Sequence, residues 1–269
     1  MYKIMKVTIL IFCLVVFCGR AMAAPVSGTH PIVDGSIVAL AGEYDFVYDR
    51  DLKSSDTASG IIDEQNTCYL KLVFKAIDLV SVYVKAGATS FKLESKMNDG
   101  TTIREDYSAG FYTGGGAKLV HEFIPRVRFA ADAQLNWWSC NIDEAEYVDS
   151  GGRIISSNNG DTSAFEVQLA GILSYEIDYQ SLVHPVHGGL PLMIPYIGLK
   201  YSHLKIDSEV TAVSSGMNVS MPDDMKNDNK LGIVFGTDIS FPSVDGFSFN
   251  IEGRFLDDNA LSGYLKYNF

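Results

Sequence analysis

The feature that most constrains the fold is an alternation of apolar and polar residues with a period of two, which runs through most of residues 36–269. Successive side chains of a β-strand point to opposite faces, so this period predicts strands with one apolar and one polar face. In residues 67–77 one face holds Cys68, Leu70, Leu72, Phe74 and Ala76, and the other holds Tyr69, Lys71, Val73 and Lys75. Residues 248–255 repeat the split, with Phe249, Ile251 and Phe255 opposite Asn250, Glu252 and Arg254.

The strand pattern predicts an all-β, antiparallel transmembrane β-barrel. After the N-terminal residues no stretch is apolar for eighteen residues, so no transmembrane helix is expected there. Strands can span lipid only as a closed barrel, because every backbone group must find a partner. The pattern gives about ten strands, or eight if one pair is misread: 36–48, 67–77, 80–88, 109–121, 126–139, 163–176, 192–206, 230–241, 246–256 and 259–269.

The first 23 residues have the three parts of a secretory signal peptide. Lys3 and Lys6 give a positive start, residues 7–19 are uncharged and apolar, and Ala21 and Ala23 supply the small residues that a signal peptidase reads. We therefore expect cleavage after Ala23 and a single barrel domain over residues 24–269. A retained membrane anchor is the alternative, and a lipoprotein is disfavoured because no small residue stands just before Cys18.

Composition excludes several classes of protein. The chain carries a formal net charge of −12, and loss of the signal's basic residues would make it more negative. Nucleic acid is not an expected partner, because its phosphates demand a basic face. Only Cys68 and Cys140 would remain after cleavage, too few for a disulfide framework. They fall on opposite strand faces, lipid-facing and lumen-facing, so we expect two free thiols.

The connections between the predicted strands alternate in length. Long polar links at 49–66, 89–108, 140–162 and 207–229 suit outer loops, and short links at 78–79, 122–125 and 242–245 suit periplasmic turns. Two links break the rule: 177–191 is long for a turn, and 257–258 is short for a loop. The outer connections carry nearly all of the negative charge. We expect an acidic outer rim that meets lipopolysaccharide through divalent cations, with ordinary solvated loops as the alternative.

The C-terminal strand ends in an aromatic residue. Phe269, Tyr267, Leu265 and Leu261 share one face, which is the expected lipid-facing side. This strand resembles the terminal strand of bacterial outer-membrane barrels, which implies recognition by the barrel-assembly machinery and a place in the outer membrane of a Gram-negative bacterium. Residues 82–88, 114–119 and 195–201 also resemble small barrels of the OmpA, OmpX and opacity type through their Tyr, Gly and Lys alternation. The resemblance implies architecture and no binding site.

The polar strand faces predict a lumen filled by paired charges, because a barrel of eight to ten strands is barely wider than its own side chains. A cross-linked plug is therefore favoured over a wide pore. Glu122, Arg126 and Glu176 are also candidates for the periplasmic rim. The predicted lumen acids are Glu43, Asp45, Glu122, Asp132, Glu166, Glu176, Asp238 and Glu252, and the bases are Lys71, Lys75, Lys85, Lys118, Arg126, Arg128, Lys200, Arg254 and Lys266.

The sequence predicts no catalytic, cofactor-binding or metal-binding residues. No Asp-x-His of the omptin proteases occurs, and Asp223-Asp224 with His203 is a poor substitute. Ser202 and His203 are adjacent and so face opposite sides. His184 and His187 flank Pro185 and lack a third ligand nearby, so a polar turn is favoured. Asp228 and Asp257-Asp258 lack calcium-loop spacing.

The sequence thus favours a structural or surface-interaction barrel whose surface ligand it does not identify. A narrow channel for small solutes is the alternative, and an outer-membrane hydrolase ranks third.

Overall fold

The computed structural model describes residues 36–54, 58–98, 100–148, 154–157, 160–177, 191–214, 217–220, 224–241 and 246–269. The predicted signal peptide, His184, His187 and Asp223 lie outside these ranges. Within them, no helix is long and apolar enough to cross a membrane. The strands are β1 (Val38–Ser54), β2 (Ala58–Ile77), β3 (Val80–Met97), β4 (Thr102–Ile124), β5 (Val127–Val148), β6 (Ile154–Ser157), β7 (Gly160–Tyr175), β8 (Leu192–Ser214), β9 (Met217–Ser220), β10 (Asp224–Asn227), β11 (Leu231–Ser240), β12 (Phe247–Phe255) and β13 (Asn259–Asn268).

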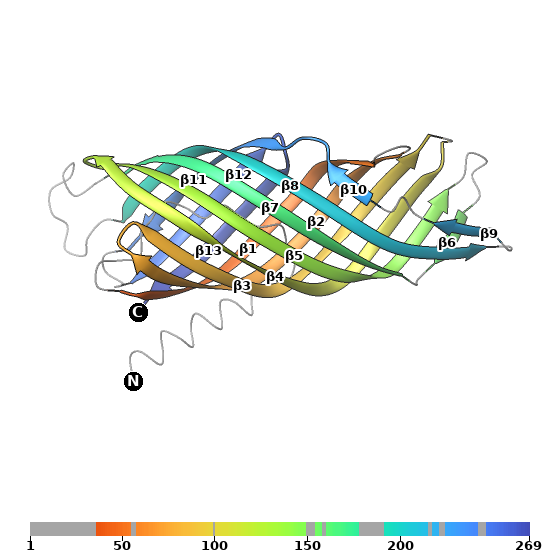
Figure 1. The fold of residues 1–269 in the computed structure, drawn as a ribbon, viewed down its shortest axis with the longest axis horizontal. Helices are drawn as coiled ribbons and strands as arrows, with labels where there is room; N and C mark the ends of the chain where they lie inside the picture. The colour runs from red at the N-terminus through yellow and green to blue at the C-terminus, as the bar shows by residue number, and fades with distance from the viewer. Residues whose placement is uncertain are drawn as a thin grey trace.

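Ten of these strands close into a ring, in the order β1, β2, β3, β4, β5, β7, β8, β11, β12 and β13. Every pairing is antiparallel, and the ring closes where β13 pairs with β1, for example Leu261 with Phe46. This confirms the predicted ten-stranded antiparallel barrel. The start of β1 and the C-terminus lie at the same end of the barrel, which we call the terminal end (Figure 1).

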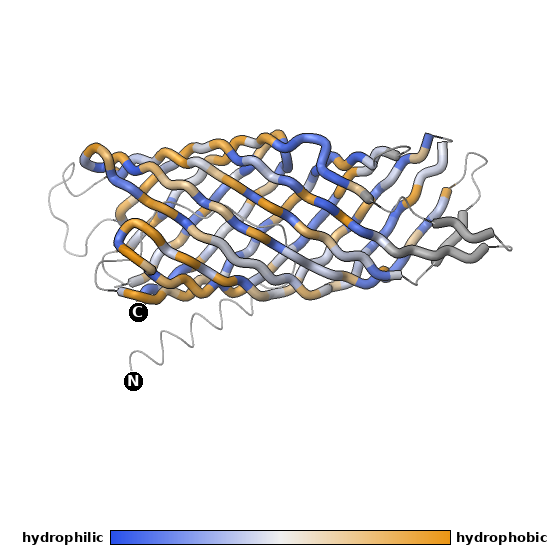
Figure 2. Tube along the Cα trace, viewed as in Figure 1, coloured by the Kyte–Doolittle hydropathy of each residue, from blue (hydrophilic) through white to orange (hydrophobic). Residues whose placement is uncertain are grey.

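The outward faces near the terminal end form an apolar belt. Each of the ten strands presents mainly apolar side chains to the outside here, and hydrophobic and hydrophilic residues alternate along the trace (Figure 2). Leu199 is 69% exposed and Phe111 is 56% exposed, which no water-soluble fold would tolerate across a whole wall. Lipid would cover such a belt, and a closed barrel leaves no unpaired strand edge within it. The chain therefore has the architecture of an outer-membrane β-barrel.

Several strands are much longer than predicted. β2, β3, β4, β5 and β8 have 18 to 23 residues, so large parts of the expected loops at 49–66, 89–108, 140–162 and 207–229 are strand instead. In these extensions most of the outward side chains are charged or polar, as at Asp51, Lys92 and Asp106, while inward side chains such as Ile62 and Leu93 are buried. Beyond the belt the outward face is therefore polar and the inward face apolar, which is the reverse of the arrangement within the belt. The high polar content of these segments made them resemble loops.

The extensions form a part of the barrel that we call the projection, at the end opposite the C-terminus and the start of β1 (Figure 1). β11, β12 and β13 have only 9 or 10 residues and stop below it. Their place in the wall is taken by β10, which pairs with Leu52–Ser54 of β1 and with Lys205–Asp207 of β8. The ring of ten strands thus narrows to eight, and the short 257–258 link turns beneath β10 instead of forming a loop at the rim.

Two glycines make room inside the wall for tyrosine side chains. A Cβ atom on Gly116 would lie 2.6 Å from the hydroxyl of Tyr83, and one on Gly236 would lie 2.5 Å from the hydroxyl of Tyr196. Each glycine thus lets a neighbouring strand's tyrosine lie flat against the lumen wall. Gly116 belongs to the Gly114–Gly116 run of β4, so this run has a packing role.

Candidate functional site in the barrel lumen

Within the apolar belt most of the large inward side chains are polar and buried, beside a small apolar cluster of Ala130, Ile172, Tyr196 and Val234. The acids among them are Glu43, Asp45, Asp132, Glu166, Asp238, Glu252, Asp257 and Asp258, and the bases are Arg50, Lys71, Lys85, Lys118, Lys200, Arg254 and Lys266. The two signs nearly balance, which keeps the cost of removing these charges from water tolerable. This confirms twelve of the predicted lumen charges.

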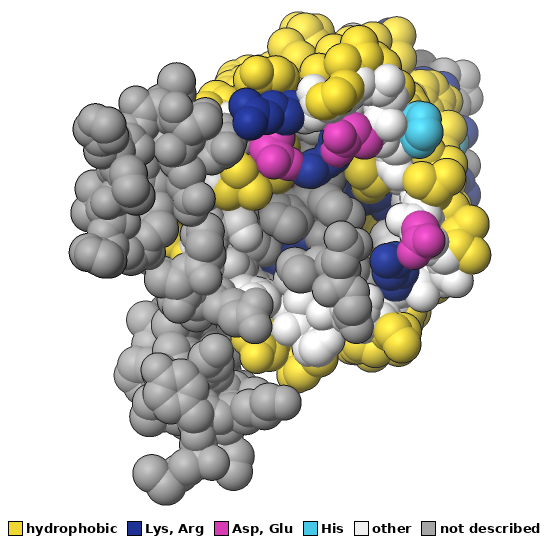
Figure 3. Space-filling model, turned by 90° about the vertical axis from the view of Figure 1, so that its left-hand side faces the viewer, with side chains coloured by type: hydrophobic (Ala, Val, Ile, Leu, Met, Phe, Trp, Pro, Cys, Tyr) yellow, Lys and Arg dark blue, Asp and Glu magenta, His cyan; other side chains and the backbone are white. Residues whose placement is uncertain are grey.

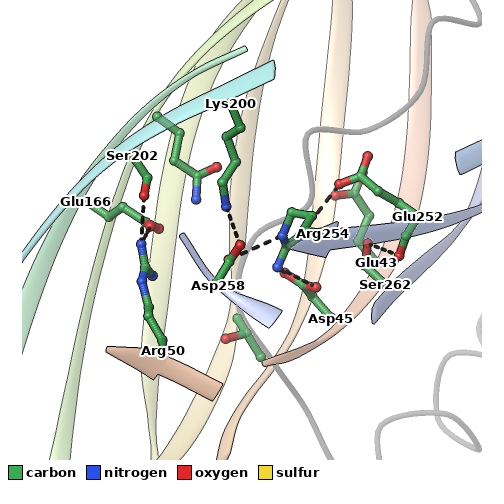
Figure 4. Close-up of polar contacts among 12 residues, drawn as sticks. Glu43, Asp45, Arg50, Glu166, Lys200, Ser202, Glu252, Arg254, Asp258 and Ser262 are labelled. Atoms are coloured by element: carbon green, nitrogen blue, oxygen red, sulfur yellow. Dashed lines mark hydrogen bonds and ion pairs between the residues drawn. The ribbon is translucent and has the colours of Figure 1, made fainter. Parts of the chain in front are cut away.

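One ion pair joins opposite walls of the barrel. Arg50 of β1 and Glu166 of β7 are both fully buried, and their Nη2 and Oε1 atoms lie 2.6 Å apart (Figure 4). β1 and β7 are five places apart in either direction round the ring of ten, so the pair crosses the lumen. The same Arg50 nitrogen donates to Ser202 Oγ of β8 at 3.0 Å. Three parts of the wall therefore meet at this guanidinium group.

The turn between β12 and β13 enters the same cluster. Lys200 Nζ lies 2.8 Å from Asp257 Oδ2 and 2.8 Å from Asp258 Oδ1, and Ser202 Oγ donates to Asp257 at 2.9 Å. These aspartates were expected on the acidic outer rim, and that expectation is wrong. The turn ends within the wall, so both carboxylates are buried and face the bases of the lumen.

Arg254 anchors the cluster to the first strand. Its Nη2 donates to both carboxylate oxygens of Asp45, at 2.9 and 2.8 Å, and its Nε donates to Asp258 at 3.3 Å (Figure 4). Charge-assisted bonds of this kind are stronger and more directional than neutral ones. Arg50, Lys200 and Arg254 thus hold five carboxylates in one network: Asp45, Glu166, Glu252, Asp257 and Asp258.

Nearer the terminal end, tyrosines and lysines continue the plug. Tyr83 donates to Asp132 at 2.7 Å, and Lys118 lies 3.3 Å from the same carboxylate. Glu43 accepts from Tyr69 at 2.6 Å and lies 3.1 Å from Lys71. Further bonds of this type link Tyr264 to Asp238, Tyr196 to Glu252, and Lys85 to Gln134. These bonds join strands that are neighbours or two places apart, so they cross-link the strands along the lumen wall.

The rim of the terminal end carries the other predicted lumen charges. Arg128 pairs with Glu122 and with Glu176, all at least partly exposed, and Lys75 pairs with exposed Asp78. Arg126 is exposed and takes a positive φ of 71° in the turn between β4 and β5. Figure 3 shows basic and acidic side chains inside a ring of hydrophobic ones at this end. The rim assignment of Glu122, Arg126 and Glu176 is therefore correct, and Arg128 and Lys75 join them.

The projection has an apolar interior instead of a polar one. Phe91 and Tyr107 stack with their ring centroids 4.2 Å apart. The cluster continues across the projection and reaches β10 through Met225; its other members there include Leu52, Ile62, Leu93, Ile103, Ile142, Tyr147, Leu204 and Ile206. An apolar core therefore lies directly above the charged network. Most of the side chains that line this part of the axis are apolar, in contrast to the charged network below.

One carboxyl is buried in the apolar core of the projection. Glu105 is 1% exposed, and its Oε2 accepts a hydrogen bond from Tyr107 at 3.0 Å while Oε1 has no partner. Burial raises the pKa of Glu105 to about 7, against the lowering effect of the Tyr107 hydroxyl. By contrast, bonds from Arg104 and Lys96 hold the pKa of the partly exposed Glu94 below its usual range.

The residues considered for catalysis and metal binding do not converge. Ser202 is buried inside and His203 lies on the outward face, as the adjacent positions predicted. Among the described residues, no group of three or more His, Cys, Asp or Glu side chains is placed to hold a metal ion. Cys68 lies on the outward face and Cys140 is buried in the interior, so the predicted faces are confirmed, and no disulfide joins these two cysteines.

Sequence reasoning missed four buried charges of the interior. Arg50 and Glu105 lie in segments interpreted as loops, and Asp257 and Asp258 were placed on the rim. A bulge between Val47 and Asp49 shifts the inward register of β1 from odd to even positions. The only sequence signal that could have placed Arg50 inside the barrel was the short alternation of residues that follows this bulge.

Comparisons with known proteins give structural likeness alone. No family model and no curated protein matches the chain. The translocator domain of the autotransporter NalP from Neisseria meningitidis aligns over 88% of this chain and 90% of its own, at 11% identity and a TM-score of 0.46. The outer membrane protease OmpT from Escherichia coli aligns over 87% and 94%, at 10% identity and 0.45. The toluene transporter TbuX from Ralstonia pickettii aligns over 93% and 95%, at 9% identity and 0.39.

Proposed function

We propose that this protein is a closed outer-membrane barrel that holds a rigid, folded projection at the cell surface, in a structural or surface-interaction role. The observation that carries the proposal is that the apolar side chains move from the outward to the inward face of the wall at the end of the apolar belt. Below it, the wall is apolar outside and polar inside; above it, the wall is charged outside and apolar inside. A wall of the second kind is that of a water-soluble fold, so the projection stands in water.

In this arrangement the projection points outward from the cell and the terminal end lies in the periplasm. The short turns at 78–79 and 125–126 lie at the terminal end, which is the usual periplasmic pattern. The projection's outward acids, such as Asp51, Asp106 and Asp161, would then face the lipopolysaccharide layer, and divalent cations would bridge the like charges. The role proposed here includes no catalysis.

A narrow channel for small solutes is the second candidate. Its support is the polar lining of the lumen within the belt. Against it stand the Arg50–Glu166 ion pair, which crosses the lumen, and the apolar core above it. We therefore rank the closed barrel first.

Cysteine labelling on intact cells tests the proposal. Single cysteines replace Asp51 and Lys92 on the projection's outward face and Leu199 in the belt, and the unsubstituted protein reports any signal from Cys68 and Cys140. A membrane-impermeant maleimide should label the D51C and K92C variants and leave L199C unlabelled. Labelling of L199C, or protection of both projection sites on cells that display folded barrel, would contradict the proposal.

A further inference from the structure

β10 fills a gap in the wall of the projection between β1 and β8 (Figure 1). It has four residues, Asp224–Asn227, and it pairs with three residues of each neighbour. β1 and β8 continue into the ring of the belt, whereas β10 is not one of the ten ring strands. Neighbouring strands lie about 4.8 Å apart, so the edges of β1 and β8 are about 10 Å apart across β10. This gap, which we call the strap slot, is one strand wide.

Two side chains hold β10 in the strap slot. Met225 is 3% exposed and belongs to the apolar core of the projection, and a Cβ on Gly60 would lie only 2.7 Å from its Cε atom. Asn227 accepts a hydrogen bond from the Leu204 backbone N–H at 3.0 Å and donates to the Ser202 carbonyl at 3.0 Å. The slot therefore contains a pocket for one apolar side chain, which the lack of a side chain at Gly60 helps to form, and a site for one amide.

On the outer face, the charges of β10 lie beside charges of the same sign. Exposed Lys226 stands in register between Lys53 of β1 and Lys205 of β8. Exposed Asp228, directly after β10, donates its backbone N–H to the carbonyl of exposed Asp51 at 3.0 Å, so two aspartates are also neighbours. Like charges that are directly opposite on adjacent strands are destabilising.

Ion pairs offset this repulsion only in part. Lys53 lies 3.4 Å from Asp228, with both side chains at least half exposed, and Lys205 lies 2.8 Å from Asp207 of its own strand. Exposed pairs of this kind contribute little to stability. Lys226 has no ion-pair partner among the described residues. The inner face of β10 therefore favours its place in the wall, and the outer face opposes it.

We propose that β10 is an exchangeable strap and that the strap slot accepts an extended strand of a partner protein in its place. The partner strand puts an apolar residue at the position of Met225, an acidic one at that of Lys226 and a basic one at that of Asp228. The acidic side chain then lies between two lysines, and the basic one lies beside an aspartate. Because β10 is tethered to the chain, a partner has to bind better than β10 does, and the reversed order of charges supplies that advantage.

This inference gives the surface-interaction role a site and a class of partner, and it rests on the proposed function, which exposes the strap slot at the cell surface. β10 supplies none of the charged groups of the network around Arg50, Lys200 and Arg254. The lumen therefore stays closed when β10 leaves the wall.

Thiol labelling of the purified barrel in nanodiscs tests whether β10 detaches. Ile206→Cys places a thiol beneath the strap, because Ile206 is buried and stands in register with Met225. Ile103→Cys is the control, since Ile103 is buried in the same apolar core but belongs to β4, away from the strap slot. We expect a small maleimide to label I206C faster than I103C, and the unsubstituted protein reports any signal from Cys68 and Cys140. Equal rates for the two variants would overturn the inference.

An exchange of two charges tests why β10 detaches. K226D/D228K keeps the net charge of the chain and gives β10 the order of charges proposed for the partner. It should lower the labelling rate of I206C about fivefold, as about 1 kcal/mol of cross-strand pairing would give, and leave that of I103C unchanged. An unchanged or higher rate for I206C would contradict the role given to these charges. Heat-modifiable migration of each variant verifies that the barrel is folded.

Peptide binding to the same nanodiscs tests the partner class. Two dye-labelled peptides are compared by fluorescence anisotropy: one has the sequence of residues 222–229, and the other has the residues at 226 and 228 exchanged. The exchanged peptide should bind the wild-type barrel at least about fivefold more tightly than the native one, and the K226D/D228K barrel more weakly than the wild type. No binding of either peptide, or equal binding of both, would overturn the acceptor role. Labelling of D51C and K92C on cells judges the proposed function separately, so the two can fail independently.

Discussion

Arg50 and Glu166 form a fully buried ion pair between β1 and β7, which are opposite strands of the ring, with 2.6 Å between Nη2 and Oε1. Most of the other lumen bonds link strands that are neighbours or two places apart. The pair therefore fixes the distance across the barrel as well as the conformation of one wall.

Removing one partner should be costly. Arg50→Leu leaves Glu166 buried without its ion-pair partner, and such changes cost roughly 3–5 kcal/mol. Arg50→Leu/Glu166→Leu removes both charges and should be the less damaging variant. The measurement is the midpoint of the heat-induced migration shift of the folded barrel in detergent. A double variant that loses as much as the two single variants together would show that the two side chains are not coupled.

A methyl group on Gly116 should disturb the wall. Its Cβ would lie 2.3 Å from the carbonyl oxygen of Ala133 and 2.6 Å from the Tyr83 hydroxyl, so Gly116→Ala forces a shift of backbone as well as of a side chain. We expect a lower unfolding temperature and a reduced yield of folded barrel. Gly171→Ala is the matched control, because its Cβ would meet only the Phe129 ring at 3.7 Å. Equal behaviour of the two variants would refute this packing role.

The projection should be less stable at alkaline pH because of Glu105. Its folded-state pKa of about 7 lies above the ordinary 4.5, so the folded state binds the proton more tightly than the unfolded state does. The contribution of this carboxyl to the free energy of unfolding is then fully present below pH 4.5. It is lost as the pH rises towards 7, by on the order of 3 kcal/mol. Hydrogen exchange of the projection's amides at pH 5.5 and pH 8, corrected for the intrinsic rate, measures this. Glu105→Gln should flatten the difference, and an equal pH dependence in both proteins would rule out this carboxyl as the cause.

The last residue should matter for assembly. Phe269 is exposed on the outward face, and its ring packs edge-on against Tyr267 with centroids 5.1 Å apart. Deleting Phe269 or changing it to Asp should leave precursor in the periplasm, because the terminal strand is the proposed signal for the assembly machinery. Membrane fractionation provides the measurement, with Phe241→Asp at the same end as a control for a charge in the belt. Normal insertion of both Phe269 variants would show that this signal is not used.

Strand alternation predicted the ten-stranded ring because membrane strands keep one apolar face over their whole length. It could not predict the projection, since the apolar face changes sides at bulges such as the one between Ile62 and Glu64. The polar plug could be predicted because the inward residues of regular strands such as β2 alternate strictly with the lipid-facing ones. The roles of Arg50 and Asp258 could not be predicted. Arg50 makes its contact across the lumen, and Asp258 is buried because the short strands β12 and β13 stop beneath β10.

The most direct test of the central claim, that the lumen is closed, is a single-channel current measurement on the wild-type barrel in planar lipid bilayers. Insertion is verified by recovering heat-modifiable protein from vesicles of the same lipid, and a wide porin is recorded in parallel. The closed network around Arg50 and the apolar core above it predict no stepwise conductance at low voltage. Stable, uniform current steps from the wild-type protein would contradict the closed barrel and favour the narrow channel.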